Sequence, residues 1–305
     1  MNTQAELIDK INKLKKEKNA VILAHCYQNV EIDEVADFVG DSLYLSRQAA
    51  KTNADIIVFA GVYFMAETAK ILSPNKKVLL PRMESGCLMA NMINLKQIRE
   101  FKAQNPDIPV VCYVNSTAEV KSECDICCTS ANAVDIVRSL NSDKVLFVPD
   151  MNLGAYVASK LPNVEVIRYQ GYCPTHMRIL PEDVLAQKEL YPNAKILCHP
   201  ECDKPVVELA DVVGSTTAII KYAKESSENE FIIVTELGVV ERLKRDLPDK
   251  KFIHVSHKAV CPSMKWTHLE DVYNVLLNET NEVNVNPEYI QKSLNMIERM
   301  LAVNV

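Results

Sequence analysis

Three cysteines stand at almost equal intervals along this chain of 305 residues, each a few residues beyond an apolar segment. They are Cys87, Cys173 and Cys261, and the intervals between them are 86 and 88 residues. The apolar segments that precede them lie at residues 77–81, 164–169 and 251–255. This spacing indicates that one structural unit occurs three times, and that each copy brings one thiol to a common place.

Three converging thiolates have few chemical uses in a protein. They can bind zinc with a water molecule as the fourth ligand, or they can hold a [4Fe–4S] cluster through three of its irons. The cluster leaves one iron without a protein ligand, and such an iron can act as a Lewis acid on a substrate hydroxyl or carboxylate, which is dehydratase chemistry. The spacing by itself does not decide between zinc and the cluster.

Other cysteines compete for a role in metal binding. Cys124, Cys127 and Cys128 form a local cluster, and Cys198 and Cys202 lie four residues apart. Neither group has a counterpart in the other two copies, and a free cysteine commonly behaves as a small buried apolar residue. We therefore expect these groups to be reduced structural residues, because a chain with no secretory segment normally keeps its thiols free.

Short apolar segments alternate with amphipathic helices along the whole chain. The predicted strands lie at 21–24, 56–60 and 78–80, then at 110–114, 145–148 and 164–169, and finally at 196–198, 231–234 and 252–255. Strands that alternate with helices form βαβ units with parallel sheets. The sequence therefore predicts an α/β protein of three pseudo-threefold-related three-layer αβα units, with parallel sheets around a central cluster and active site.

The same pattern predicts the boundaries of the units. The first αβα unit spans residues 1–87, the second spans 88–173 and the third spans 174–265. No fourth unit follows, since residues 269–277 and 287–301 have the pattern of two amphipathic helices. We expect this tail, residues 266–305, to pack back on the first unit.

Polar residues follow the first strand of each copy in pairs two residues apart. The pairs are His25 and Tyr27, Tyr113 and Asn115, and His199 and Glu201. Residues two apart in an extended segment lie on the same side of it, and ligands of parallel α/β folds bind beyond the carboxyl ends of the strands. We therefore expect all six side chains to face one central cavity.

A hydroxyl residue stands 17 positions after the first polar residue of each pair. These residues are Ser42, Ser130 and Thr216, and each lies at the start of a predicted helix. A serine or threonine there is usually only a helix cap. Its threefold recurrence favours a second role, because hydroxyls and free N–H groups at a helix start suit a carboxylate or phosphate.

Composition and charge exclude several classes of partner. The net charge of −6 and the dispersed lysines argue against nucleic acid, which requires a basic surface. No apolar segment approaches the roughly 20 residues that span a bilayer, and the N-terminus has no secretory signal pattern. We expect a cytoplasmic protein that acts on small molecules and binds neither membrane nor nucleic acid.

At this point a family resemblance emerges over nearly the whole chain. The sequence resembles quinolinate synthase, an enzyme of de novo NAD biosynthesis. The motifs that carry the resemblance are His25-x-Tyr27-Gln28, Gly40-Asp41-Ser42, residues 64–72, Gly86-Cys87, Tyr113-Val114-Asn115, Cys128-Thr129-Ser130, Pro149-Asp150, Gly171-x-Cys173-x-x-His176, His199-Pro200-Glu201-Cys202, Gly214-Ser215-Thr216 and Cys261-x-x-Met264-Lys265. Some members carry three cysteines at the last motif. Here Cys261 stands alone, so we expect no local disulfide switch.

The resemblance implies one [4Fe–4S] cluster per chain, bound by Cys87, Cys173 and Cys261. It implies a transferase-type condensation of iminosuccinate with dihydroxyacetone phosphate to quinolinate, with loss of phosphate and two waters, in which the open iron acts as a Lewis acid. L-aspartate oxidase or aspartate dehydrogenase is then expected as a functional partner that supplies the imine.

Family roles transfer to matching residues. Proton transfer falls to Glu201 and Tyr27, with His199 and Tyr113 also in the catalytic set and with help expected from His176 and Lys265. Substrate binding falls to His25, Ser42, Tyr113, Val114, Asn115, Ser130, His199, Pro200, Glu201 and Thr216. Two rival interpretations are a zinc enzyme and an iron sensor without turnover. The sensor accounts for the cysteines but not for Glu201 or the anion-binding hydroxyls.

Overall fold

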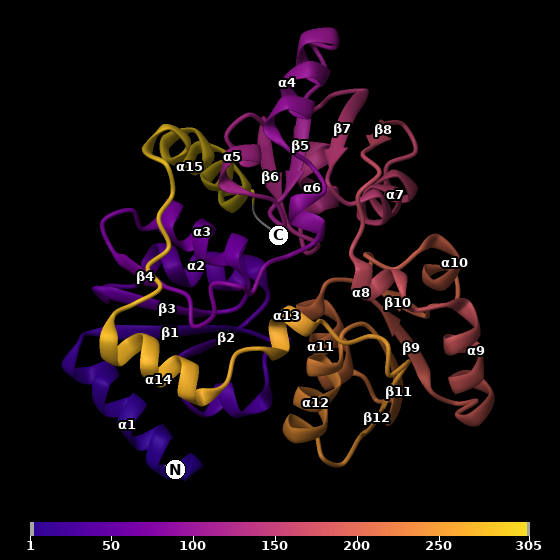
Figure 1. Ribbon diagram of the computed structural model, residues 1–305. Helices are drawn as coiled ribbons and strands as arrows, with labels where there is room; N and C mark the ends of the chain where they lie inside the picture. Colours follow the sequence, from indigo (N-terminus) through magenta and orange to yellow (C-terminus); the bar gives the residue numbers. More distant parts are fainter. Residues whose placement is uncertain (1–2, 304–305) are drawn as a thin grey trace.

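Three parallel four-stranded sheets organise the protein, as seen in a computed structural model (Figure 1). The structure describes residues 3–303, so the first two and last two residues of the predicted units lie outside this description. The first sheet has the order β2-β1-β3-β4. Its strands are β1 (Ala20–His25), β2 (Phe38–Gly40), β3 (Ile56–Ala60) and β4 (Lys77–Leu79).

The second and third sheets have the same relative strand order as the first. The second, β6-β5-β7-β8, contains β5 (Val110–Tyr113), β6 (Ile126–Cys128), β7 (Lys144–Val148) and β8 (Glu165–Arg168). The third, β10-β9-β11-β12, contains β9 (Lys195–Cys198), β10 (Val212–Val213), β11 (Glu230–Val234) and β12 (Lys251–His254). The α/β class and the three parallel sheets are confirmed, while an exact pseudo-threefold axis stays a prediction.

Helices cover both faces of the first sheet. Alternate residues of a strand point to opposite faces, and accordingly Ile22 packs in one apolar cluster while Leu23 packs in another. The helices α1 (Gln4–Glu17) and α14 (Leu269–Asn278) bury Ile11 and Val272 in the cluster of Ile22. The helices α2 (Ser42–Lys51) and α3 (Tyr63–Leu72) contribute to the cluster of Leu23. This arrangement is the three-layer unit that the sequence predicts.

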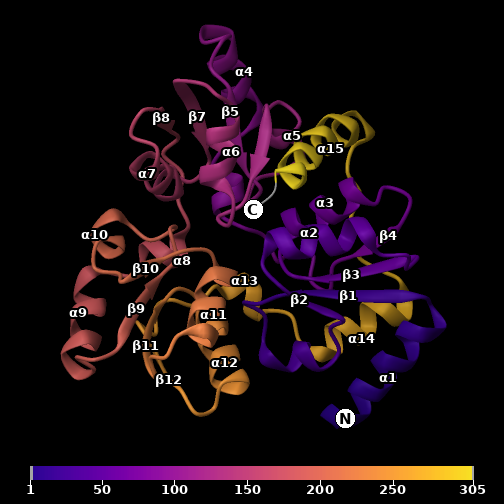
Figure 2. The ribbon, with the colours of Figure 1, turned by 180° about the vertical axis from the view of Figure 1, so that it is seen from behind.

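The other two units carry their own helices (Figures 1 and 2). The second has α4 (Leu95–Gln104), α5 (Ala118–Lys121), α6 (Ala133–Ser139) and α7 (Met151–Lys160). The third has α9 (Pro181–Leu190), α10 (Lys204–Val207), α11 (Thr216–Glu225) and α12 (Leu237–Asp246). Short turns of helix near the centre and the loops are η1 (Val30–Glu34), η2 (Met89–Asn91), α8 (Pro174–Met177) and α13 (Pro262–Lys265).

The C-terminal tail holds two units together. Helix α14 lies against α1 and β3 of the first unit, and residues 281–283 hydrogen-bond along the outer edge of β4. Helix α15 (Pro287–Ala302) lies mainly against α5 and β6 of the second unit and also reaches α3. The tail therefore packs on the first unit only in part, because the apolar stripe of α15 with Ile297 and Met300 joins the core around the second sheet. The proposed boundaries of the units stay a prediction.

Each sheet has a fourth strand that the sequence pattern does not predict. The strands β2, β6 and β10 have three, three and two residues. Such short segments have no measurable periodicity, and they form only because the long neighbouring strand supplies hydrogen-bond partners. Among the described helices, none combines the length and the apolar character that crossing a membrane requires.

Candidate active site

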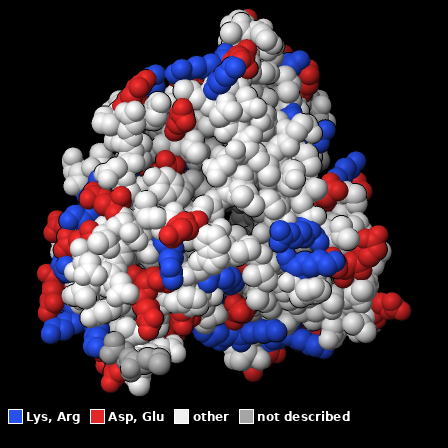
Figure 3. All heavy atoms as spheres, in the orientation of Figure 1, with Lys and Arg blue, Asp and Glu red and all other residues white. Residues whose placement is uncertain are grey.

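One cavity of about 330 Å³ is lined by residues of all three units. Figure 3 shows a hollow near the centre of the molecule, where the three units of Figure 1 meet. The lining includes thirteen of the residues singled out from the sequence: His25, Tyr27, Ser42, Cys87, Tyr113, Asn115, Ser130, Cys173, His176, His199, Glu201, Thr216 and Cys261. The carboxyl ends of β1, β5 and β9 bring the strand-end pairs together.

Two of the strand ends share one local geometry. The backbone N–H of Tyr27 donates to Nδ1 of His25 at 3.2 Å, and the backbone N–H of Glu201 donates to Nδ1 of His199 at 3.3 Å. An Nδ1 that accepts is unprotonated, so a neutral ring carries its proton on Nε2. That Nε2 of His199 lies 3.3 Å from Oγ of Ser130. Each histidine is thus oriented as a neutral hydrogen-bond donor toward the cavity.

Burial keeps both imidazoles neutral. It lowers the pKa of His25 to about 3, with Arg242 adding to the effect, and it lowers the pKa of His199 to about 4, partly opposed by Glu201. At neutral pH these rings therefore offer N–H groups to the cavity but no positive charge.

We expect this burial to appear in the pH dependence of stability. The pKa of His25 is about 3 in the folded protein and 6.5 as a free group, so the unfolded state binds more protons below pH 6.5. Relative to a His25→Gln variant, the wild-type protein should lose about 1.4 kcal/mol of unfolding free energy per pH unit as pH falls from about 6 to 4. Urea unfolding of both proteins at several pH values measures this difference. Parallel curves would contradict it.

The hydroxyls of Ser42 and Thr216 are not the helix caps. Asp41 caps α2 by accepting from the N–H of Tyr44 at 3.0 Å, and Ser215 caps α11 by accepting from Ala218 at 3.3 Å. The residues at the cap positions are therefore one place earlier than the two hydroxyls that line the cavity. Both hydroxyls line the cavity in the first turn of a helix, where backbone N–H groups are unpaired, and the Thr216 hydroxyl also lies 3.4 Å from the Tyr27 hydroxyl.

A continuous chain of hydrogen bonds crosses the cavity. The Tyr113 hydroxyl donates to Oε1 of Glu201 at 2.6 Å, and Oε2 of Glu201 lies 2.8 Å from Nδ1 of His176. Nε2 of His176 lies 2.9 Å from Oγ1 of Thr235, which is 3.0 Å from the Tyr27 hydroxyl. The five side chains come from three units, and protons can shift along such a chain.

Glu201 is ionised within this chain. Burial by itself raises the pKa of a carboxyl, but the charge and hydrogen bond of His176, with His199 and Tyr113, hold the pKa of Glu201 well below its usual range. The tyrosine hydroxyls respond in the opposite sense, because burial and the Glu201 charge raise the pKa of Tyr27 and of Tyr113. The site therefore places the ionised carboxylate of Glu201 beside weakly acidic hydroxyls.

Exposure separates the three predicted ligand cysteines from the rest. Cys87, Cys173 and Cys261 are partly exposed, whereas the other seven, Cys26, Cys112, Cys124, Cys127, Cys128, Cys198 and Cys202, are buried. All ten are free thiols. The three partly exposed thiols are close enough to interact electrostatically, since Cys261 raises the pKa of Cys87 and Cys87 raises the pKa of Cys173.

The three cysteines also share one backbone environment. A backbone N–H three residues further on interacts with each sulfur and lowers its pKa; these groups belong to Ala90, His176 and Met264. Burial outweighs this effect and raises the pKa of all three thiols, to about 12 for Cys87. A thiolate is thus disfavoured without a cation, and N–H groups directed at sulfur are typical of metal-bound thiolates.

A second donor set overlaps the first. Ligand atoms of Cys173, His176 and Glu201 all lie within 4.8 Å of one another and can hold a metal ion. Nδ1 of His176 is 3.2 Å from the Cys173 sulfur. Cys173 therefore belongs both to the three-cysteine set and to the hydrogen-bonded chain of Glu201.

Three residues expected at the site do not line the cavity. These are Val114, whose N–H bonds Cys128 in the sheet, Pro200, and Lys265. The Lys265 ammonium lies 3.4 Å from Glu241 and 3.7 Å from Glu236 instead. Val114 and Pro200 sit between the paired polar residues, so the alternation that directs those residues inward directs these two away.

Sequence reasoning missed the end of the middle strand of the third unit. Thr235 joins His176 to Tyr27, and Glu236 lines the cavity and accepts from the backbone N–H of Cys261 at 3.2 Å. Both directly follow β11. The rule that ligands bind at carboxyl strand ends would have found them if it had been applied to the second strand of each unit as well as to the first.

Gly238 permits the contact between the third unit and the first. A Cβ at this position would lie 2.8 Å from the carbonyl oxygen of Cys26 and 2.8 Å from Cα of Tyr27. We expect Gly238→Ala to lower the unfolding free energy by about 1–3 kcal/mol, because two backbones must separate. Urea unfolding tests this against Gly86→Ala, whose Cβ has no neighbour closer than 3.8 Å. Equal stability of both variants would contradict the expectation.

Comparison with known proteins decides the family. The family described as quinolinate synthetase A protein matches residues 9–302. The chain belongs to the quinolinate synthase family. A quinolinate synthase of Alkaliphilus metalliredigens (strain QYMF) is 55% identical over 300 residues, which is 98% of this chain and 99% of the relative.

Two further relatives support the same assignment. Quinolinate synthases of Geobacter sp. (strain M21) and Dehalococcoides mccartyi (strain CBDB1) are 52% and 54% identical, over 99% and 98% of this chain and 99% of each relative. The resemblance found from the sequence is therefore confirmed. The chain is an enzyme of NAD biosynthesis, and its candidate active site is the cavity between the three units.

Proposed function

We propose that this enzyme condenses iminosuccinate with dihydroxyacetone phosphate to quinolinate, with loss of phosphate and two waters. The observation that carries the proposal is the meeting, in one cavity, of anion-binding donors with a carboxylate base and three thiols. Quinolinate has two neighbouring carboxylates, which require several N–H and O–H donors. The condensation and the dehydrations require groups that accept and donate protons.

The donors fit a dicarboxylate. His25 and Asn115 reach the cavity from two strand ends, and Ser42 and Thr216 from the first residues of α2 and α11. Ser130, expected at a helix start, lies instead in the segment between β6 and α6, two residues before the N-cap Asn132. The Asn115 side-chain oxygen is buried and has no partner among the described residues, which supports a role in binding a ligand group that donates a hydrogen bond. We propose that the N–H and O–H groups of these residues, with those of Tyr113 and His199, bind the carboxylates, and that the Asn115 oxygen accepts from a hydroxyl or N–H of the substrates.

Glu201 and Tyr27 fit the proton transfers. Glu201 is ionised and hydrogen-bonded to Tyr113, and Tyr27 stands at the other end of the chain through Thr235. We propose that Glu201 removes a proton, that Tyr27 donates one, and that His176 connects them. Lys265 is paired with two carboxylates, and we propose that it supports the loop of Cys261 and does not touch substrate.

Cys87, Cys173 and Cys261 fit a [4Fe–4S] cluster, one per chain. They are the partly exposed thiols, they come from three units, and each has a backbone N–H directed at its sulfur. When bound, the cluster would supply an iron without a protein ligand as a Lewis acid.

Anaerobic purification followed by an activity assay tests the proposal. We expect a brown protein with about four irons and four sulfides per chain, and quinolinate formed from the two named substrates. A colourless zinc protein would refute the cluster, and a cluster-loaded protein without product would refute the reaction. We further propose a cytoplasmic location, with L-aspartate oxidase or aspartate dehydrogenase as the source of the imine, since ten free thiols suit a reducing compartment.

A further inference from the structure

One arginine lies at the wall of the active-site cavity. Among the described residues that line it, Arg178 is the only lysine or arginine. It directly follows the single turn of helix α8, two residues after His176 and five after Cys173. Its side chain is exposed at the wall of the cavity, so the same short segment that carries a cysteine and a histidine of the site also carries a cation that solvent and ligands can reach.

The Arg178 side chain has no partner among residues 3–303. In the part of the chain that the structure describes, it makes no ion pair and no side-chain hydrogen bond. The nearby cations are in a different state. Nη2 of Arg242 donates to both carboxylate oxygens of Asp33, and Lys265 lies between two glutamates. Arg178 is therefore a cation of the cavity lining that has no ion-pair partner among the described residues.

The carboxylates of the lining are already engaged, so they do not compete for Arg178. Asp41 accepts from Tyr44 and from the Thr217 hydroxyl, and Glu201 is bonded to Tyr113. Glu236 accepts from two backbone N–H groups. A guanidinium without a partner at a cavity wall is a fork-shaped receptor for a phosphate or carboxylate.

The charge balance points to the phosphate. This step rests on the proposed function, in which the substrates bring two carboxylates and one phosphate dianion into the cavity. The neutral imidazoles and hydroxyls at the strand ends and helix starts supply N–H and O–H donors for the carboxylates, but no charge. The phosphate carries the largest charge and has no other protein cation to meet it.

We propose that Arg178 binds the phosphate group of the phosphorylated three-carbon substrate at the edge of the cavity. A hollow with basic side chains close to its rim is seen in Figure 3. The same contact stabilises the phosphate as it leaves, because the guanidinium binds the free dianion as well as its ester. Arg178 would thus decide specificity for a phosphorylated over an unphosphorylated triose.

Two variants of the cluster-loaded enzyme test the proposal. Arg178→Gln should raise KM for dihydroxyacetone phosphate by about 10- to 100-fold, the loss expected for a charged hydrogen-bonded pair, and leave KM for iminosuccinate within about twofold. Arg178→Lys should give an intermediate KM, because the charge remains without the fork. Inorganic phosphate, as a competitive inhibitor against the triose phosphate, should weaken by a similar factor in Arg178→Gln.

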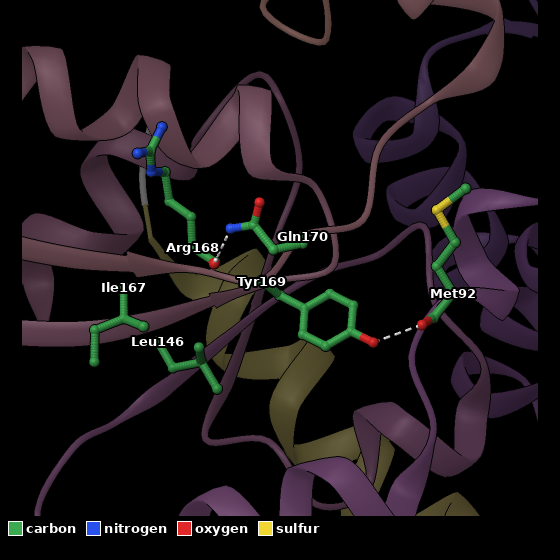
Figure 4. A pocket seen from close by; sticks show the side chains of 6 residues that line it. All are labelled: Met92, Leu146, Ile167, Arg168, Tyr169 and Gln170. Carbon is green, nitrogen blue, oxygen red and sulfur yellow. Dashed lines mark hydrogen bonds between the residues drawn. The ribbon is translucent and has the colours of Figure 1, made fainter.

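Arg168→Gln is the matched control for the change of charge. Arg168 lies in a separate surface pocket beside β8, where Figure 4 shows its guanidinium directed away from Tyr169. In that pocket Tyr169 donates to the carbonyl of Met92 at 2.7 Å and Gln170 donates to the carbonyl of Arg168 at 3.1 Å. We expect Arg168→Gln to leave both KM values and the inhibition by phosphate unchanged.

The outcomes separate this inference from the proposed function. A wild-type enzyme that forms no quinolinate refutes the proposed function. An active wild-type enzyme whose Arg178→Gln variant keeps the KM for the triose phosphate refutes the role of Arg178 alone. A rise confined to the KM for iminosuccinate also overturns it, because the guanidinium would then bind a carboxylate. If Arg168→Gln raised the KM for the triose phosphate equally, the effect of Arg178→Gln would come from the change in net charge, and the proposed contact would be refuted.

Discussion

Replacing Cys173 by serine is expected to abolish quinolinate formation, by a factor of at least about 10³, and to lower the iron bound per chain. Cys173 belongs to both donor sets of the site. The Cys87 thiol is close enough to raise its pKa, and its sulfur lies within 4.8 Å of ligand atoms of His176 and Glu201. A serine hydroxyl is a poor ligand for the soft irons of a cluster. Iron and sulfide analysis of the anaerobically purified variant, with an assay for quinolinate, measures both effects.

Cys124→Ser is the matched control for this variant. Cys124 belongs to the local cysteine cluster, is buried, and donates from its sulfur to the carbonyl of Val120 at 3.2 Å, a bond that serine can replace. We expect this protein to retain its iron and its activity. If Cys124→Ser lost the iron and Cys173→Ser kept it, the metal site would lie in the local cluster and the assignment here would be wrong.

Glu201→Gln is expected to lower kcat by about 10²- to 10⁴-fold, the usual contribution of a general base. The substitution keeps the shape of the side chain and an oxygen that can accept from Tyr113, but it removes the charge. His176 then faces an amide in place of the carboxylate now 2.8 Å from its Nδ1. Steady-state kinetics of the cluster-loaded variant at saturating substrate measures the loss.

Two further observations make this second result specific. Glu165→Gln changes the same group at the exposed edge of β8, where Glu165 pairs with Lys144, and should leave kcat unchanged. The Glu201→Gln protein should also bind normal amounts of iron, since the three cysteines remain. Full activity in Glu201→Gln would exclude a base at this position, and lost iron would show that Glu201 acts through the metal site.

The sequence by itself determined the elements of the site that depend on local order. A buried parallel strand is a short apolar run, and its end is marked by the first polar residues after it. His25, Tyr113 and His199 could therefore be placed from the sequence. The three cysteines proposed as ligands could be singled out by their interval, and they are the thiols that the fold leaves partly exposed.

Only the tertiary structure decided how these residues connect. Thr235 follows an apolar strand like many other hydroxyl residues, and its bonds to His176 and Tyr27 join segments 59 and 208 positions away. Which hydroxyl caps a helix and which lines the cavity depends on one position in the chain: Ser215 caps α11, whereas Thr216 lines the cavity beside the Tyr27 hydroxyl. The packing of α15 on the second unit depended on which apolar surface was left uncovered. The periodicity of the sequence shows which residues are buried, but not which residues they contact. Those contacts join segments that are distant in the sequence, so only the tertiary structure shows them.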